Sequence, residues 1–126
     1  VEFIRLKSRS DSHAQISEAS PHRLVQMLME GGLDRMAQAK GALSRGDIAQ
    51  KGLMLGKAIE IISGLRDGLE PEKAEDPAAV QQLDALYEYM SNRLVEANGV
   101  NDADMIDEVA RLLITVKSGW DAIAPQ

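Results

Sequence analysis

Several residue types are scarce or missing in this sequence, and each absence removes a class of protein. There is no cysteine, so neither a disulfide framework nor a thiolate metal site is available. Lys and Arg number 14 against 20 Asp and Glu, and the resulting net charge of −6 argues against a nucleic-acid surface. No apolar run approaches the roughly 20 residues that span a bilayer, and the opening stretch VEFIRLKSRS lacks a signal-peptide pattern. We therefore expect no nucleic-acid partner and no membrane insertion.

Aromatic residues are also few: the chain has one Phe, two Tyr and one Trp. A core must then be built mainly from Leu, Ile, Met, Val and Ala, and such side chains favour helices over strands. A chain of 126 residues is long enough for one core of this kind. The composition thus favours a single all-α domain.

Patterns that carry catalysis or bind a ligand are missing as well. His13 and His22 are the only histidines, and neither stands in the Glu-x-x-His spacing of a di-iron bundle. Gly31 and Gly32 lie inside a helical pattern and do not follow a strand, so they do not form a phosphate loop. We expect His22, in the first turn of a helix, to be a surface residue. The sequence predicts no enzymatic activity, no metal site and no cofactor.

The clearest element is a long amphipathic helix from Ser20 to Ser44. Ser20 is a favourable cap, and Pro21 suits the first helical position, where a missing N–H costs nothing. Gly32 falls near the centre of the apolar face, where the close approach of another helix would explain it. The apolar residues at helical spacing are Leu24, Val25, Leu28, Met29, Met36, Ala39, Ala42 and Leu43.

Three more amphipathic helices follow. Their predicted caps are Asp47, Asp76 and either Asn101 or Asp102, and the third helix is expected to close at Asn98–Gly99. Four helices with short links most simply pack as an antiparallel up-down-up-down four-helix bundle, although two helical hairpins exchanged between chains are a second solution. We expect residues 1–19 to be a flexible N-terminal arm and residues 20–124 to be the bundle, and leave open whether residues 1–10 are native.

The second helix carries a wider apolar arc than contact with one neighbour requires. Methionine-rich faces can repack around different partners, so we predict a groove here for an added helix or an extended segment. Ile61 is expected at the edge of the stripe, where bundle packing depends on it least. The predicted groove residues are Met54, Ile61, Leu65 and Leu69 on the second helix, with Leu86, Tyr87, Met90 and Leu94 on the third.

The chain contains, in order, the stretches ASPHRLVQMLMEGGLDRMAQAKGAL, RGDIAQKGLMLGKAIEIISGLRDGL, LDALYEYMSNRLVEAN and DEVARLLITVKSGWDAI. Together they span Ala19 to Ile123, and this ordered combination resembles the flagellin-specific export chaperone family (FliS). The resemblance implies a cytoplasmic four-helix bundle without enzymatic activity. It also implies binding of the disordered C-terminal segment of flagellin, which prevents premature polymerisation and holds the subunit for the flagellar type III export gate. We expect the free chain to be a monomer.

One feature departs from the family pattern. Members commonly carry one or two Tyr in the N-terminal arm, whereas the first Tyr here is Tyr87. In the family the arm can cover the groove before the client arrives, but only Ile16 is a large apolar residue near that position here. The sequence therefore leaves open whether the arm acts as a lid. It also leaves open a second function, that of a helical adaptor or regulatory module that binds another protein.

Overall fold

The computed structural model describes residues 19–123, and its helices begin where the sequence predicts. The elements are α3 (Pro21–Ser44), α4 (Ile48–Asp67), the short 3-10 turn η1 (Pro71–Lys73), α5 (Pro77–Val100) and α6 (Ala103–Ala122). Each α-helix starts with a side chain that accepts a hydrogen bond from a backbone N–H of the first turn, and these caps are Ser20, Asp47, Asp76 and Asp102. A cap of this kind stabilises a helix by about 1 kcal/mol. The predicted N-terminal arm lies, apart from Ala19, outside the described residues.

The end of α5 differs from the prediction. Asn98 and Gly99 do not close the helix, which continues to Val100, and Asn101 adopts the left-handed conformation with φ 55°. Asn98 remains helical while its carbonyl and side-chain oxygens accept hydrogen bonds from Lys51 Nζ of α4, at 2.8 and 2.7 Å. Because Asn101 ends α5, Asp102 is the residue that caps α6.

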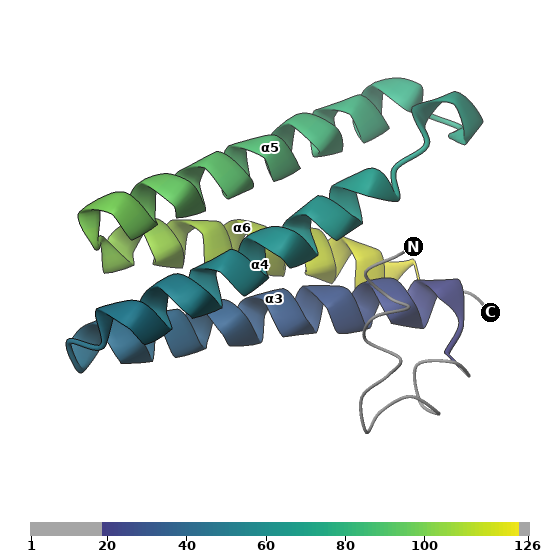
Figure 1. Cartoon of the computed structure of the whole chain (residues 1–126). Coiled ribbons are helices and arrows are strands. Elements are labelled where there is room, and N and C mark those ends of the chain that lie inside the picture. Colours follow the sequence, from purple (N-terminus) through teal and green to yellow (C-terminus); the bar gives the residue numbers. More distant parts are fainter. Residues whose placement is uncertain (1–18, 124–126) are drawn as a thin grey trace.

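The four helices form a closed antiparallel bundle (Figure 1). Both α3 and α5 pack against α4 and against α6, so the helices follow one another around the bundle in chain order. This confirms the predicted all-α up-down-up-down arrangement. One chain supplies all four sides, so the bundle does not require an exchange of hairpins between chains. Antiparallel order also places the starts of α3 and α5 at the same end as the ends of α4 and α6 (Figure 1).

Gly32 lies where α3 approaches both α4 and α6. A Cβ atom at this position would lie 3.3 Å from Leu113 Cδ2 of α6 and 3.4 Å from Ile61 Cγ2 of α4. Glycine thus suits the close approach of two neighbouring helices, as the sequence predicts.

The wide apolar arc of α4 is covered in part by the bundle itself. Since α4 packs against both α3 and α5, the apolar side chains that face these two helices are buried. Two neighbours thus account for the buried part of the arc, and a client groove along α4 stays a prediction. The buried apolar side chains of α4 are Met54, Leu55, Ala58, Ile61, Ile62 and Leu65.

Candidate functional site

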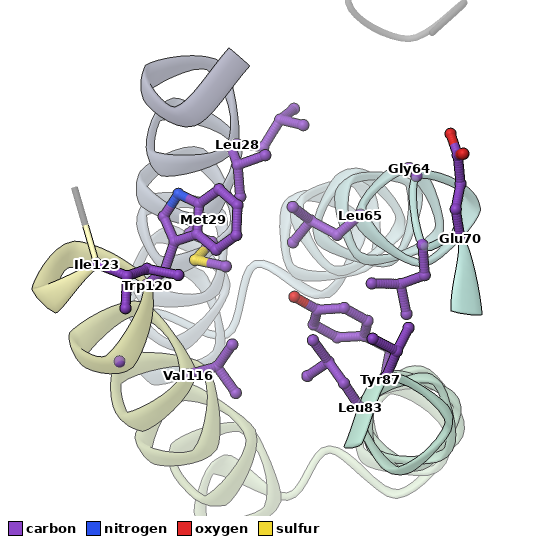
Figure 2. Close-up of a pocket in the computed structure, with 15 residues that line it drawn as sticks. Leu28, Met29, Gly64, Leu65, Glu70, Leu83, Tyr87, Val116, Trp120 and Ile123 are labelled. Atoms are coloured by element: carbon purple, nitrogen blue, oxygen red, sulfur yellow. The ribbon is translucent and has the colours of Figure 1, made fainter. Parts of the chain in front are cut away.

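An apolar cavity of about 380 Å³ opens at the end of the bundle where α3 and α5 begin and α4 and α6 end (Figure 2). All four helices contribute to its wall, together with the residues that follow α4 and α6. This volume lies within the range of pockets that hold small ligands or a few side chains of a partner. The lining residues are Val25, Leu28, Met29, Gly64, Leu65, Gly68, Leu69, Glu70, Val80, Leu83, Tyr87, Val116, Gly119, Trp120 and Ile123.

The cavity arises from the same helical spacing that builds the core. Leu83 and Tyr87 lie four residues apart on α5, as do Val116 and Trp120 on α6, so each pair faces inward from one side of its helix. These side chains nevertheless do not fill the space between the helices, because three of the lining residues are glycines, which have no side chain. The bundle therefore leaves at this end a space that its own side chains do not fill.

Trp120 forms the α6 side of the cavity and is held firmly in place. Its ring stacks on His22 of α3 with a centroid separation of 4.6 Å and an interplanar angle of 10°. Its Nε1 donates a hydrogen bond of 3.0 Å to the carbonyl oxygen of His22. His22, expected at the surface, thus supports the cavity wall, and its Nε2 atom is buried without a hydrogen-bond partner among the described residues.

A polar network beside this pair joins α3 to α6. Gln26 Nε2 donates to Asp121 Oδ1 at 2.7 Å, and Lys117 Nζ donates to Asp121 Oδ2 at 2.8 Å. Both hydrogen bonds lower the pKa of the Asp121 carboxyl below its ordinary value, and the bond from Lys117 has the larger effect. The network fixes the last turn of α6, and with it Trp120, against the first turns of α3.

Arg66 joins the opposite two helices at the same end of the bundle. Its Nε and Nη2 atoms donate to the two carboxylate oxygens of Asp84 at 2.6 and 3.1 Å, and Nη2 also donates to Glu88 at 3.0 Å. The hydrogen bond from Arg66 lowers the pKa of the Asp84 carboxyl. A bidentate pair of this kind sets the orientation of the two helices as well as their distance.

Among the described residues that line the cavity, Tyr87 alone carries a hydroxyl. Only 2% of its surface is exposed, and Figure 2 shows its hydroxyl directed toward the space between Leu65, Met29 and Val116. Burial raises the pKa of the Tyr87 hydroxyl to about 12, so the group stays neutral at physiological pH. The charged group of the lining is Glu70, whose carboxylate pairs with Lys73 at 2.8 Å.

The chemistry of the cavity is that of apolar burial with a single hydroxyl. Among residues 19–123, no three His, Cys, Asp or Glu side chains gather where they could hold a metal ion. None of the described helices is long and apolar enough to cross a membrane. The cavity can therefore shelter apolar side chains of a partner.

Comparison with known proteins places the chain in a family. A model of the family described as "Flagellar protein FliS" matches residues 5–126. The chain belongs to the FliS family. A flagellar secretion chaperone FliSB of Pseudomonas aeruginosa is 57% identical over 111 residues, which cover 88% of this chain and 86% of that protein. The flagellar secretion chaperone FliS of Vibrio cholerae is 45% identical over 113 residues, or 90% and 82% of the two chains. That of Salmonella typhimurium is 39% identical over 124 residues, or 98% and 90%.

These relatives confirm the predicted class of function. The FliS-family chain is a chaperone of flagellar export and not an enzyme, in keeping with a site built only for binding. The resemblance to the FliS family in the sequence is confirmed in the same way.

The predicted groove residues of this FliS-family bundle do not lie on one surface. Leu65, Leu69 and Tyr87 line the cavity. Leu86 is half-buried beside the core without lining the cavity, and the remaining four, Met54, Ile61, Met90 and Leu94, are buried in the core. Whether any of these residues contacts a client stays a prediction.

The expectation that Ile61 lies at the edge of the bundle is wrong. Only 2% of its surface is exposed, and its side chain lies against Gly31 and Gly32 of α3. The sequence reasoning instead missed the α3 and α6 walls of the cavity, above all Leu28, Val116 and Trp120. Their only signal in the sequence is their place in the first or last turns of an apolar stripe.

Proposed function

We propose that this chain binds the disordered C-terminal segment of flagellin, and that apolar side chains of that segment enter the cavity between the helix ends. The observation that carries the proposal is the cavity itself, a nearly all-apolar space that the described side chains of the bundle do not fill. A disordered client loses chain entropy when it binds, so it needs a large apolar contact area in return. A cavity that admits side chains of the client supplies such an area at one end of the bundle.

The remaining parts of the proposal concern the setting of this complex. We propose that the chain acts in the cytoplasm as a monomer, prevents premature polymerisation of flagellin and delivers it to the flagellar export gate. Sedimentation of the free chain tests the monomer, which is contradicted by a dimer at micromolar concentration. Retention of the chain with its client on an immobilised cytoplasmic part of the gate tests the delivery.

The cavity is tested by calorimetry with a flagellin C-terminal peptide and the variant Leu83→Asp. Leu83 lines the cavity and is only half-buried, so the bundle tolerates a polar residue there better than in its core. An aspartate desolvated by the client is costly, and binding should weaken at least tenfold, or about 1.4 kcal/mol. The melting temperature should change little.

A matched control places the same charge away from the cavity. Leu53 lies near the start of α4, at the opposite end of the bundle, and 52% of its surface is exposed. Leu53→Asp should bind the peptide as the parent does. Equal weakening in both variants would point to a general effect of negative charge. Unchanged binding by Leu83→Asp would show that the client uses another face.

A further inference from the structure

The charged side chains of the bundle are divided unevenly between its two ends. When each helix is divided at its middle, the half with the cavity comprises residues 19–32, 58–88 and 113–123. This half carries ten Asp or Glu and four Lys or Arg, whereas the other half of the described chain carries seven of each. The excess of negative charge among residues 19–123 therefore lies wholly at the cavity end.

At that end, the excess lies on one side of the cavity. Residues 58–88 form the second half of α4, the link with η1 and the first half of α5, and they carry eight Asp or Glu and two Lys or Arg. We call them the acidic side. On the α3 and α6 side the signs balance: Arg23 pairs with Glu30 at 3.2 Å, and Lys117 pairs with Asp121 at 2.8 Å. The apolar space thus lies between a neutral side and an acidic side.

The acidic side reaches the cavity itself. Glu70 is a lining residue, and Figure 2 shows it beside Gly64, on the α4 and α5 side of the space. The link then adds Glu72, Glu75 and Asp76, all of them exposed, at the end of the bundle where α3 begins and α6 ends (Figure 1). Charges of one sign beside apolar walls create a stronger field than charges on an open surface. The mouth of the cavity therefore attracts cationic groups.

We propose that the cavity binds a client segment in which Lys or Arg stands next to the apolar side chains, with these basic side chains against the acidic side. The inference rests on the proposed entry of a flagellin segment into this cavity. Apolar contact alone does not distinguish one hydrophobic segment from another, whereas complementary charge favours basic segments and like charge rejects acidic ones. Because only one side is acidic, the charges also set which way round the segment lies.

The acidic side acts mainly before the apolar contact is made. Its link carboxylates are exposed, so each contributes little to the final complex. Several charges of one sign nevertheless attract a basic segment over about 10 Å at about 0.1 M salt and raise the rate of association. Binding should therefore depend on ionic strength, which a purely apolar site does not explain.

Two versions of the flagellin C-terminal peptide test the sign of the charge. One carries Lys at two polar positions next to its apolar residues, and the other carries Glu at the same positions. At about 0.1 M salt, calorimetry should show that the Lys peptide binds about tenfold more tightly than the Glu peptide. At about 1 M salt, where charges are screened beyond about 3 Å, most of this difference should vanish.

Reversal of charge in the chain tests the location. The double variant Glu72→Lys, Glu75→Lys changes two exposed residues of the link that do not line the cavity, so the fold should be kept. It should bind the Glu peptide at least as tightly as the Lys peptide. The matched control Glu96→Lys, Asp104→Lys makes the same change in net charge at exposed residues of the opposite end, and should keep the preference of the parent.

The outcomes separate this inference from the function on which it rests. If the two peptides bind the parent equally while Leu83→Asp weakens binding of the unmodified peptide, the cavity is still the client site and the charge preference is wrong. If both double variants lose the preference to the same extent, net charge and not the acidic side is responsible, which also overturns the inference. If no version of the peptide binds the parent, the proposed function fails and the inference with it. A preference for Lys that salt removes, and that only the link variant reverses, supports the inference.

Discussion

Leu28 and Ile61 show how far two residues of one core can differ in their surroundings. Ile61 is enclosed by α3 and α4, with its side chain against Gly31 and Gly32. Leu28 keeps 9% of its surface exposed and borders the cavity, so part of its side chain faces space that no other side chain fills. Removing atoms from a packed site leaves a new void, whereas removing them beside a cavity only enlarges an existing one.

Replacement of each residue by Ala should reveal this difference. We expect Ile61→Ala to lower the free energy of unfolding by about 2–5 kcal/mol, and Leu28→Ala to lower it by less. Urea denaturation of the two variants and the parent measures both values. A Leu28→Ala variant that loses as much stability as Ile61→Ala would mean that the cavity closes around Leu28 in solution.

The helices are joined at their surfaces by networks that differ from one pair of helices to the next. Arg66 and Asp84 connect α4 to α5, Arg93 and Glu108 connect α5 to α6, and Asp121 connects α6 to α3 through Gln26. Exposed ion pairs contribute little each. Their common property is that each contains a carboxylate that pairs with a Lys or Arg side chain, Lys117 in the case of Asp121.

The free energy of unfolding should therefore depend on pH in the acidic range. Hydrogen bonds from Arg66, Tyr89 and Lys117, respectively, are the main cause of lowered pKa values at Asp84, Glu108 and Asp121, below the ordinary 3.8 for Asp and 4.5 for Glu. The unfolded chain then takes up protons at higher pH than the folded chain. The stabilisation is complete above the ordinary pKa values and is lost as the pH falls through the lowered ones.

The measurement is the free energy of unfolding by urea between about pH 6 and pH 3, with loss expected at the acidic end. Asp84→Asn should reduce the dependence on pH, because one of the three carboxylates no longer titrates. Glu60→Gln removes an exposed carboxylate that is in none of the ion pairs of the described residues, and should leave the dependence as in the parent. A parent whose stability is constant down to pH 3 would contradict the role of these networks.

For the molecule as a whole, the cavity predicts a coupling between client binding and stability. A client that binds only the folded bundle stabilises it by about 2.7 kcal/mol at a concentration one hundred times its dissociation constant. We expect the flagellin C-terminal peptide to raise the melting temperature by roughly 5–15 °C under these conditions. Leu83→Asp should lose most of this increase, whereas Leu53→Asp should keep it. Nucleotides and divalent metals should leave the melting temperature unchanged.

The fold could be read from the sequence because its signals are local. Ser20 and Asp47 mark helix starts by their own hydrogen bonds, and Gly32 stands in the centre of an apolar face. The cavity could not be read in this way. Whether Ile61 or Trp120 borders open space depends on how four helices diverge toward one end, and an apolar stripe looks the same where it is covered and where it is not.

The walls of the cavity come from stretches of chain that are synthesised far apart in time. Val25 and Leu28 are among the first described residues to leave the ribosome, whereas Val116 and Trp120 are among the last. A nascent chain that lacks the end of α6 has no fourth wall, and Leu28 and Leu83 then face water. With the client in the proposed site, binding is thus a property of the finished chain, and we expect that an incomplete copy does not compete with it for newly made flagellin.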